Sequence, residues 1–387
     1  MMPNLPLRQV RVLDFTRHLP GPFATDLLCR LGAEVLKVEP PDGDPTRWIP
    51  PFDGDYSALF NLVNSGKESV VIDLKKSEGR ELVGTLAEHV DVVVESYRPG
   101  VAAAFGIDAK RLRAINPRLV HCSISGFGSA NPRSAHDLNF VALAGLLDLQ
   151  RDAQGQPILP STQIGDMAGA LFGALTILAA LLEQQRSGSG ATIEVSMADA
   201  TRALMPTAES LYRGTHHTPE SFMLTGALPS YNVYQTADGK HIAVAALEPH
   251  FWEVFCNAVG LPDLISKQYV ESAKNEVFAT LRTTIASRTR EEWERIFAAV
   301  DACVEPVLTI EEAHQRLGDP MESHPLQRNF PSRPRAVPRL GDAFERAIEM
   351  ARIDAAERTR LERSGAFQAR ERLKKFIAKT ADKLRRI

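Results

Sequence analysis

Residues 10–39 read VRVLDFTRHLPGPFATDLLCRLGAEVLKVE, and this stretch decides the fold that we expect. Its two ends, 10–15 and 33–39, are apolar and rich in Val, which predicts two strands. Residues 23–31 predict a helix between them, which Pro22 can open and Gly32 can end. A strand, a helix and a second strand in so short a stretch are typical of a parallel sheet with crossover helices.

The same alternation continues to residue 125 and resumes after residue 190. Further strands are predicted at 69–74, 91–95, 118–125 and 191–196, and further helices at 77–89, 108–115 and 199–211. The fold class that follows is α/β, with a Rossmann-like, doubly wound parallel sheet. Ligands of such sheets bind beyond the carboxyl ends of the strands, so the loops there are the first candidates for a site.

The segment from Gln163 to Leu182 contains no charged residue after Asp166. Its Ala, Leu and Gly content predicts a buried helix, and its uncharged run is shorter than the roughly 20 residues that span a bilayer. Asp166 opens this run. It can be the N-cap of the helix or a catalytic carboxylate at the positive end of the helix dipole, and the segment alone leaves both interpretations open.

Residues 225–324 predict a smaller α+β domain, with a hairpin at 231–247 followed by amphipathic helices at 249–259 and 290–300. The predicted organisation is a large domain at 1–211, a linker at 212–224, the small domain at 225–324, a return linker at 325–338, and a helical segment at 339–387 that packs back on the large domain. The tail from Gln368 is basic and amphipathic, which favours a helix packed on the body or on a partner subunit over a helix on a membrane.

Composition excludes several classes of function. The net charge of −3 does not indicate nucleic acid as a partner, and an apolar content of 44% is ordinary for a globular protein. The four cysteines form no C-x-x-C pair, which disfavours a disulfide framework or a metal site and suits a reducing compartment. The first residues lack the pattern of a signal peptide. We therefore expect a cytoplasmic protein with no membrane span and no bound metal.

The loops of the large domain carry cations instead of nucleotide-binding glycines. Neither G-x-G-x-x-G nor G-x-x-x-x-G-K-[ST] follows the first strand, so NAD and ATP are not indicated. Arg98 lies in Glu-Ser-Tyr-Arg-Pro-Gly after a predicted strand, where it can meet a phosphate. Lys37 and Lys67 are further cations next to strands, whereas Arg47 is expected on the solvated surface.

Four side chains are candidates for acid–base chemistry: His136, Asp137, Asp166 and Glu248. A histidine and a carboxylate from separate loops can form a proton-transfer pair. Each also has a structural explanation. Asp137 can cap the helix that starts beside it, and Glu248, which precedes Pro249, can belong to an ordinary helix N-terminus, where acidic residues are favoured.

The order and spacing of several short segments resemble the class III CoA-transferase (CaiB/BaiF) family, and within it the α-methylacyl-CoA racemases most. The segments are PGPFAT at 20–25, LGAEVLKVE at 31–39, DLK at 73–75, ESYRPG at 95–100, NPRLV at 116–120, HDLNF at 136–140, GDMAG at 165–169, ALEPHF at 246–251 and DACVEPV at 301–307. The resemblance spans nearly the whole chain and ends near residue 368.

The resemblance implies an interlocked homodimer of subunits with a Rossmann-like large domain and a small domain, and an acyl-CoA substrate with no further cofactor. By the same resemblance, Asp166 matches the catalytic aspartate, His136 the racemase histidine, and Glu248 the acid that the small domain brings to that histidine. The residues implied in binding the CoA phosphates and adenine are Arg98, Lys67 and Lys37, with Tyr97 beside Arg98.

Two chemistries remain open at this point, with racemisation preferred. In racemisation His136 with Glu248 serves one face of the α-carbon and Asp166 the other, while backbone N–H groups at the start of the Met167 helix hold the enolate oxygen. In CoA transfer Asp166 is instead a nucleophile that forms an acyl anhydride. His136 and the low glycine content of residues 224–229 favour the racemase. A non-catalytic CoA-binding protein is a third hypothesis, which the intact His136, Asp166 and Glu248 disfavour.

Overall fold

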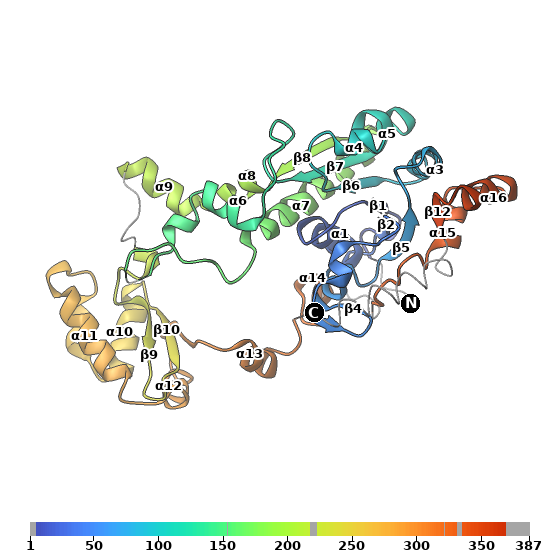
Figure 1. Ribbon diagram of the computed structural model, residues 1–387. Coiled ribbons are helices and arrows are strands. Elements are labelled where there is room, and N and C mark those ends of the chain that lie inside the picture. Colours follow the sequence, from blue (N-terminus) through green and yellow to red (C-terminus); the bar gives the residue numbers. More distant parts are fainter. Residues whose placement is uncertain (1–4, 153, 217–222, 321, 331–334, 369–387) are drawn as a thin grey trace. The chain divides into compact units, whose positions relative to one another are not determined.

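The structure, a computed structural model, describes residues 5–152, 154–216, 223–320, 322–330 and 335–368. The chain forms two compact units, one of Met1–Pro206 with Met321–Ile387 and the other of Thr207–Pro320 (Figure 1). The predicted basic helix after Gln368 and the middle of the predicted linker at 212–224 lie outside the described residues.

The first unit is built on a sheet whose described strands follow the order β12-β5-β2-β1-β6-β7-β8. The parallel strands are β1 Arg11–Asp14, β2 Glu34–Glu39, β5 Glu68–Ile72, β6 Val92–Glu95, β7 Val120–Ser125 and β8 Thr192–Ser196. The chain moves from β1 outward to β2 and β5, then returns to the other side of β1 for β6. The order therefore reverses between β1 and β6, which is the switch point where doubly wound sheets bind ligands.

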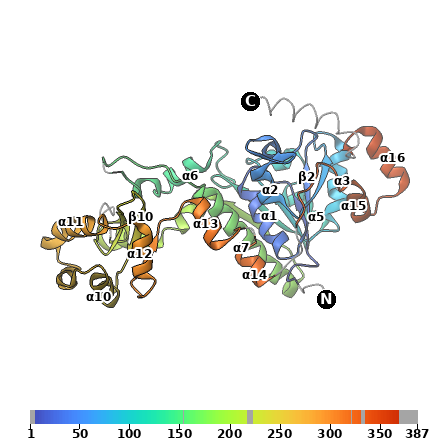
Figure 2. The ribbon, with the colours of Figure 1, turned by 90° about the horizontal axis from the view of Figure 1, so that it is seen from below.

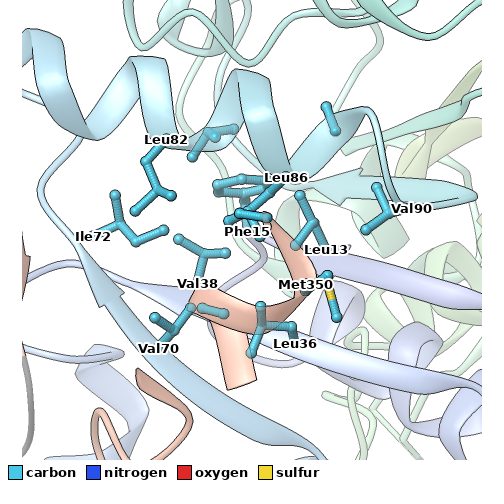
Figure 3. Packing of buried hydrophobic residues seen from close by; sticks show 14 of the residues in the cluster. Leu13, Phe15, Leu36, Val38, Val70, Ile72, Leu82, Leu86, Val90 and Met350 are labelled. Atoms are coloured by element: carbon cyan, nitrogen blue, oxygen red, sulfur yellow. The ribbon is translucent and has the colours of Figure 1, made fainter. Parts of the chain in front are cut away.

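Alternating side chains of the strands feed two hydrophobic cores, one on each face of the sheet. On one face Leu13, Leu36 and Val70 of the strands pack under α3 Ser77–Ala87 and α15 Phe344–Met350. Figure 3 shows them together with Leu82 and Leu86 of α3 and Met350 of α15. On the other face Val12 and Val94 contact the helices α1 Pro20–Arg30 and α7 Ile164–Ser187. Two buried faces explain why these strands read as nearly continuous apolar runs.

Helix α7 is the predicted apolar helix, but it is only half-buried. Its small residues face α1, beside which it runs (Figure 2), whereas Leu171, Leu175 and Leu182 are 50%, 59% and 52% exposed. Among the described residues it is the one helix long and apolar enough to cross a membrane, a test that the core helix of a globular protein also passes. The prediction of a buried helix holds for one side only, because no described residue of the first unit covers these leucines.

The C-terminal part of the chain returns to the first unit. After α15, helix α16 Ala355–Ser364 leads to β12 Phe367–Gln368, which pairs antiparallel with β5 at the sheet edge (Figure 1). The predicted return linker is partly helical, since α14 Pro325–Asn329 lies at its start. The helix predicted at 199–211 is two helices, α8 Met197–Ala203 and α9 Pro206–Thr215, because Pro206 cannot donate inside a helix.

The second unit has a three-stranded antiparallel sheet with the order β11-β10-β9. The predicted hairpin is β9 Tyr231–Gln235 and β10 His241–Ala245, and β11 Val304–Pro306 pairs with β10. The helices α10 Pro249–Ala258, α11 Lys274–Ile285 and α12 Arg290–Phe297 supply the aromatic core, with Trp252, Phe255 and Trp293 fully buried. Helix α13 Ile310–Leu317 follows β11.

Candidate active site

A cleft of about 990 Å³, open to solvent, lies at the switch point of the first unit. Its walls are the loops that follow β1, β6 and β7, together with the first turns of α6 Asp137–Leu143 and α7. Both His136 and Asp166 line this cleft, although they are thirty positions apart in the chain. The carboxyl ends of neighbouring parallel strands thus bring the two predicted catalytic side chains of this unit into one site.

The starts of α6 and α7 are tied together at the cleft. The carboxylate of Asp137 accepts the backbone N–H of Asp166 through Oδ1 at 3.0 Å. Gly165 allows this approach, because a Cβ there would lie 3.0 Å from Cβ of Phe140, 3.1 Å from Oγ1 of Thr201 and 3.2 Å from Oδ1 of Asp137. A side chain at position 165 would therefore push α6 and α8 away from α7.

Asp166 is not the N-cap of its helix. Helix α7 starts at Ile164 with Gln163 as the N-cap residue, so Asp166 lies inside the first turn. The carboxylate that caps this turn belongs to Asp137, for which a cap of its own helix was one possible role. The backbone N–H of Met167 donates to the Gln163 carbonyl at 3.0 Å. The N–H groups of Asp166 and Met167, which the sequence suggested for the enolate oxygen, are thus already engaged.

The environment of Asp166 favours its protonated form. Burial, and secondly the negative charge of Asp137, raise the pKa of Asp166 from its ordinary value of 3.8 to about 7. A carboxyl group with this pKa can both donate and accept a proton near neutral pH. His18 also lines the cleft, and burial lowers the pKa of its imidazole, with His136 among the groups that act on it.

The loop after β6 carries Tyr97 and Arg98 into the same cleft. Arg98 donates from Nη1 to Oγ of Ser134 at 3.0 Å. Tyr97 accepts a hydrogen bond from Nη2 of Arg17 at 3.2 Å, and this guanidinium lies 5.1 Å from the centre of the tyrosine ring. Tyr97 also lines an adjoining pocket of about 580 Å³, to which the loops after β2 and β5 contribute Asp42 and Lys75.

Arg17 and His18 line the cleft and Lys75 lines the adjoining pocket, and the sequence analysis selected none of them. Each follows a parallel strand directly, so the rule that selected Arg98 applies to them as well. Lys75 is exposed at the pocket, whereas the two lysines that we selected are not.

Lys37 and Lys67, which we expected to bind phosphate, both lie buried and paired inside the first unit. Lys37 is fully buried, with Nζ 2.9 Å from Oδ2 of Asp44. Lys67 is 3% exposed, and its Nζ lies 3.0 Å from Oδ2 of Asp14 and 2.8 Å from Oδ1 of Asn64. Both ammonium groups are therefore used inside the protein, where unpaired charges are strongly disfavoured.

Arg47 is likewise buried and paired. It was expected in solvent, but it is fully buried, and its guanidinium makes a bidentate contact with Glu39, 2.6 Å to Oε1 and 2.8 Å to Oε2. It also stacks on Phe60, 4.0 Å from the ring centre. These contacts anchor the long loop after β2 to the sheet.

Glu248 belongs to the second unit, where it is the N-cap residue of α10 and precedes Pro249 at the first helical position. Its side chain forms no capping hydrogen bond. Its pairing with His136 stays a prediction. Within the described ranges, no group of three or more His, Cys, Asp or Glu side chains has the arrangement of a metal site.

The chain is similar to known proteins over most of its length. It is 32% identical to an acetyl-CoA:oxalate CoA-transferase of Acetobacter aceti over 323 residues, 80% of this chain and 83% of that protein. It is 33% identical to the human alpha-methylacyl-CoA racemase over 313 residues, 79% of this chain and 78% of that protein.

Solved structures agree with this similarity. A CaiB/BaiF family protein from Brucella suis has a TM-score of 0.73 at 28% identity, covering 83% of this chain and 88% of that one. The model of CoA-transferase family III matches residues 7–322. The cleft at the switch point, with Asp166 and His136 in its wall, is thus the candidate active site of a chain that belongs to CoA-transferase family III.

Proposed function

We propose that the protein moves the α-proton of acyl-CoA thioesters and thereby epimerises 2-methyl-branched acyl-CoA, with His136 and Asp166 as the acid–base groups. The observation that carries this proposal is that both line one cleft while the pKa of Asp166 is raised to about 7. Inversion of an α-carbon requires one group that removes a proton and another that returns one to the opposite face.

Each group can take either role, depending on the enantiomer. When the imidazole of His136 removes the α-proton, Asp166 in its protonated form donates to the other face, and the reverse reaction uses the ionised carboxylate as the base. A carboxyl group of ordinary pKa would be almost fully ionised at pH 7 and would donate poorly. Glu248 of the second unit is our candidate for orienting the imidazole.

CoA transfer is the second candidate reaction, because a CoA-transferase is among the similar proteins. A CoA-transferase and a racemase are similar to this chain at 32% and 33% identity. In that reaction the ionised Asp166 attacks the thioester carbonyl, CoA leaves as the thiolate, and an acyl anhydride forms. Asp166 would then act without His136.

We propose that the CoA moiety extends along the carboxyl ends of the strands, over Tyr97 and Arg98. Arg98 and Arg17 present guanidinium groups there, which suit phosphate oxygens. The pocket beside Tyr97, with Lys75 at its wall, suits the nucleotide end of CoA. No further cofactor is needed for either reaction.

We also propose that the protein is a homodimer whose second copy covers α7. Leu171, Leu175 and Leu182 lie on one side of this helix and are each at least half exposed. Contiguous apolar faces of this kind are uncommon on monomers. The family's interlocked dimer would cover them with the same chain. All four cysteines are free thiols, which supports the cytoplasmic location that we expected.

A single experiment separates the two reactions. The protein is incubated in deuterated water with one enantiomer of a 2-methylacyl-CoA, and separately with an acyl-CoA and a free carboxylate. We expect α-deuterium incorporation that Asp166→Asn and His136→Ala each lower by about 10²–10⁴-fold. Transfer of CoA to the carboxylate without exchange at the α-carbon, and its survival in His136→Ala, would favour the transferase and reject the racemase.

A further inference from the structure

We propose that Asp137 is a positioning residue for Asp166, which fixes the first turn of α7 and keeps the Asp166 side chain in its proton-donating form. The proposal rests on the acid–base role of Asp166 proposed above, and it concerns a residue that our sequence analysis regarded as a possible cap of its own helix. Asp137 acts through Asp166 and is not itself assigned a contact with the reacting atoms.

The Asp137 side chain contacts a helix other than its own. Asp137 is the first residue of α6, yet its Oδ1 accepts the N–H of Asp166 from another helix at 3.0 Å. Its own helix is capped by other groups. The His136 carbonyl accepts the N–H of Asn139 at 2.8 Å, and Oδ1 of Asn139 accepts the N–H of His136 at 3.0 Å. The Asp137 carboxylate is therefore free to serve α7, where a negative group at the N-terminus is stabilised.

Asp137 also supplies the negative charge that acts on Asp166. Its charge acts in the same direction as burial, and both oppose ionisation of Asp166. The other ionisable side chains around the cleft are predominantly basic and come from the loops after β1, β6 and β7. They are Arg17, His18, Tyr97, Arg98, Arg133 and His136.

These basic groups would favour an ionised Asp166, but burial and the charge of Asp137 are what act on its pKa. Two of the guanidinium groups are oriented toward neutral partners. Arg17 donates to Tyr97, and Arg98 donates to Ser134. The carboxylate of Asp137 is thus the charge that opposes ionisation of Asp166, and it adds to the larger effect of burial. Removing its charge while keeping its oxygen should make Asp166 more acidic without loosening α7.

The test uses three substitutions of Asp137. Asp137→Asn keeps an oxygen acceptor for the Asp166 N–H and removes the charge. Asp137→Glu keeps the charge on a longer side chain, and Asp137→Ala removes both charge and acceptor. Asp108→Asn is the matched control, because Asp108 also accepts a helix N–H, that of Arg111 at 3.1 Å, but on α5 Ala109–Ile115 and outside the cleft.

Infrared difference spectroscopy during a pH titration follows the carboxyl group of Asp166, whose band is identified by its loss in Asp166→Asn. We expect a midpoint about one pH unit lower in Asp137→Asn, as for removal of a nearby like charge. The protonated fraction at pH 7 then falls about fivefold. Asp137→Glu and the Asp108→Asn control should titrate as the wild type does. The midpoint of the pH profile of the α-deuterium exchange rate should shift together with the midpoint of the Asp166 titration.

The outcomes distinguish this inference from the proposed function. An unchanged midpoint in folded Asp137→Asn, or an equal shift in Asp137→Glu, overturns the role of Asp137. A shifted midpoint without α-exchange in any variant or in the wild type supports Asp137 and rejects the racemase. Thermal unfolding shows whether Asp137→Ala loosens the fold. If Asp137→Asn does not fold, the deciding measurement is the titration of Asp137→Glu against the wild type. A lower midpoint in Asp137→Glu then overturns the proposal.

Discussion

Replacing Lys67 by Met tests whether this lysine stabilises the core or binds substrate. Its Nζ lies within 3.0 Å of four oxygen atoms, which belong to Asp14, Pro22, Thr25 and Asn64. Asp14 itself is fully buried on the central strand. Lys67→Met would leave its carboxylate with Thr16 and Thr25 as hydrogen-bond donors but without a cation in direct contact.

The expected loss of stability is large. Breaking a buried ion pair by removing one partner costs about 3–5 kcal/mol, which in a unit of this size lowers Tm by about 6–20 °C. The pH dependence gives an independent magnitude. Lys67, Lys37 and the two threonines oppose the effect of burial and lower the pKa of Asp14 from 3.8 to about 2. This difference corresponds to about 2.5 kcal/mol of stability, present above pH 4 and lost as the pH falls toward 2.

The assay is thermal and urea unfolding at pH 7 and at several values between pH 4 and 2. Because the variant loses much of the contribution of ionised Asp14, the difference in stability from the wild type should narrow as the pH falls. The double variant Asp14→Asn/Lys67→Met should recover part of the loss. Lys75→Met is the matched control, since Lys75 is exposed at the pocket beside Tyr97 and should affect CoA binding but not stability.

The opposite result would contradict the assignment of Lys67 to the core. If Lys67→Met unfolds at the wild-type temperature and binds CoA more weakly, Lys67 faces the ligand, and the buried arrangement described above is wrong.

Four further predictions concern the cleft and α7. Asp166→Asn should lower α-deuterium exchange by about 10²–10⁴-fold with little effect on acyl-CoA binding, measured by kinetics and by calorimetry. Asp166 is protonated below its pKa of about 7, so kcat/KM for the enantiomer to which it donates a proton should fall as the pH rises through 7. The pH profiles of kcat/KM for the two enantiomers measure this fall. Arg98→Gln should raise KM for acyl-CoA about tenfold or more while kcat stays near the wild-type value; an unchanged KM would exclude a phosphate contact. Leu175→Glu should dissociate the proposed dimer, and sedimentation of this variant at the wild-type mass would contradict the role of the α7 face.

The alternation of strands and helices was predictable from the sequence because it depends on local periodicity. Val10–Phe15 and Ala33–Glu39 are apolar on both faces, as strands covered on both sides must be, and both strands are present in the structure. The rule that ligands bind beyond the carboxyl ends of parallel strands selected Arg98 correctly as a residue of the cleft. Asp166 and His136 were selected by their motifs, and they share that cleft.

Only the tertiary structure shows which partner each charged side chain contacts. Lys67 follows the same local pattern as a ligand-binding lysine, but Asp14, which pairs with it, is fifty-three positions away in the chain. Asp137 looked like the cap of its own helix, and only the packing of α6 against α7 directs it to Asp166. Periodicity is a property of neighbouring residues, so the sequence by itself determined the layers and strand ends of this protein. Burial and electrostatic pairing depend on groups that meet only after folding, so the structure alone decided which cations stabilise the core and which carboxylate acts on Asp166.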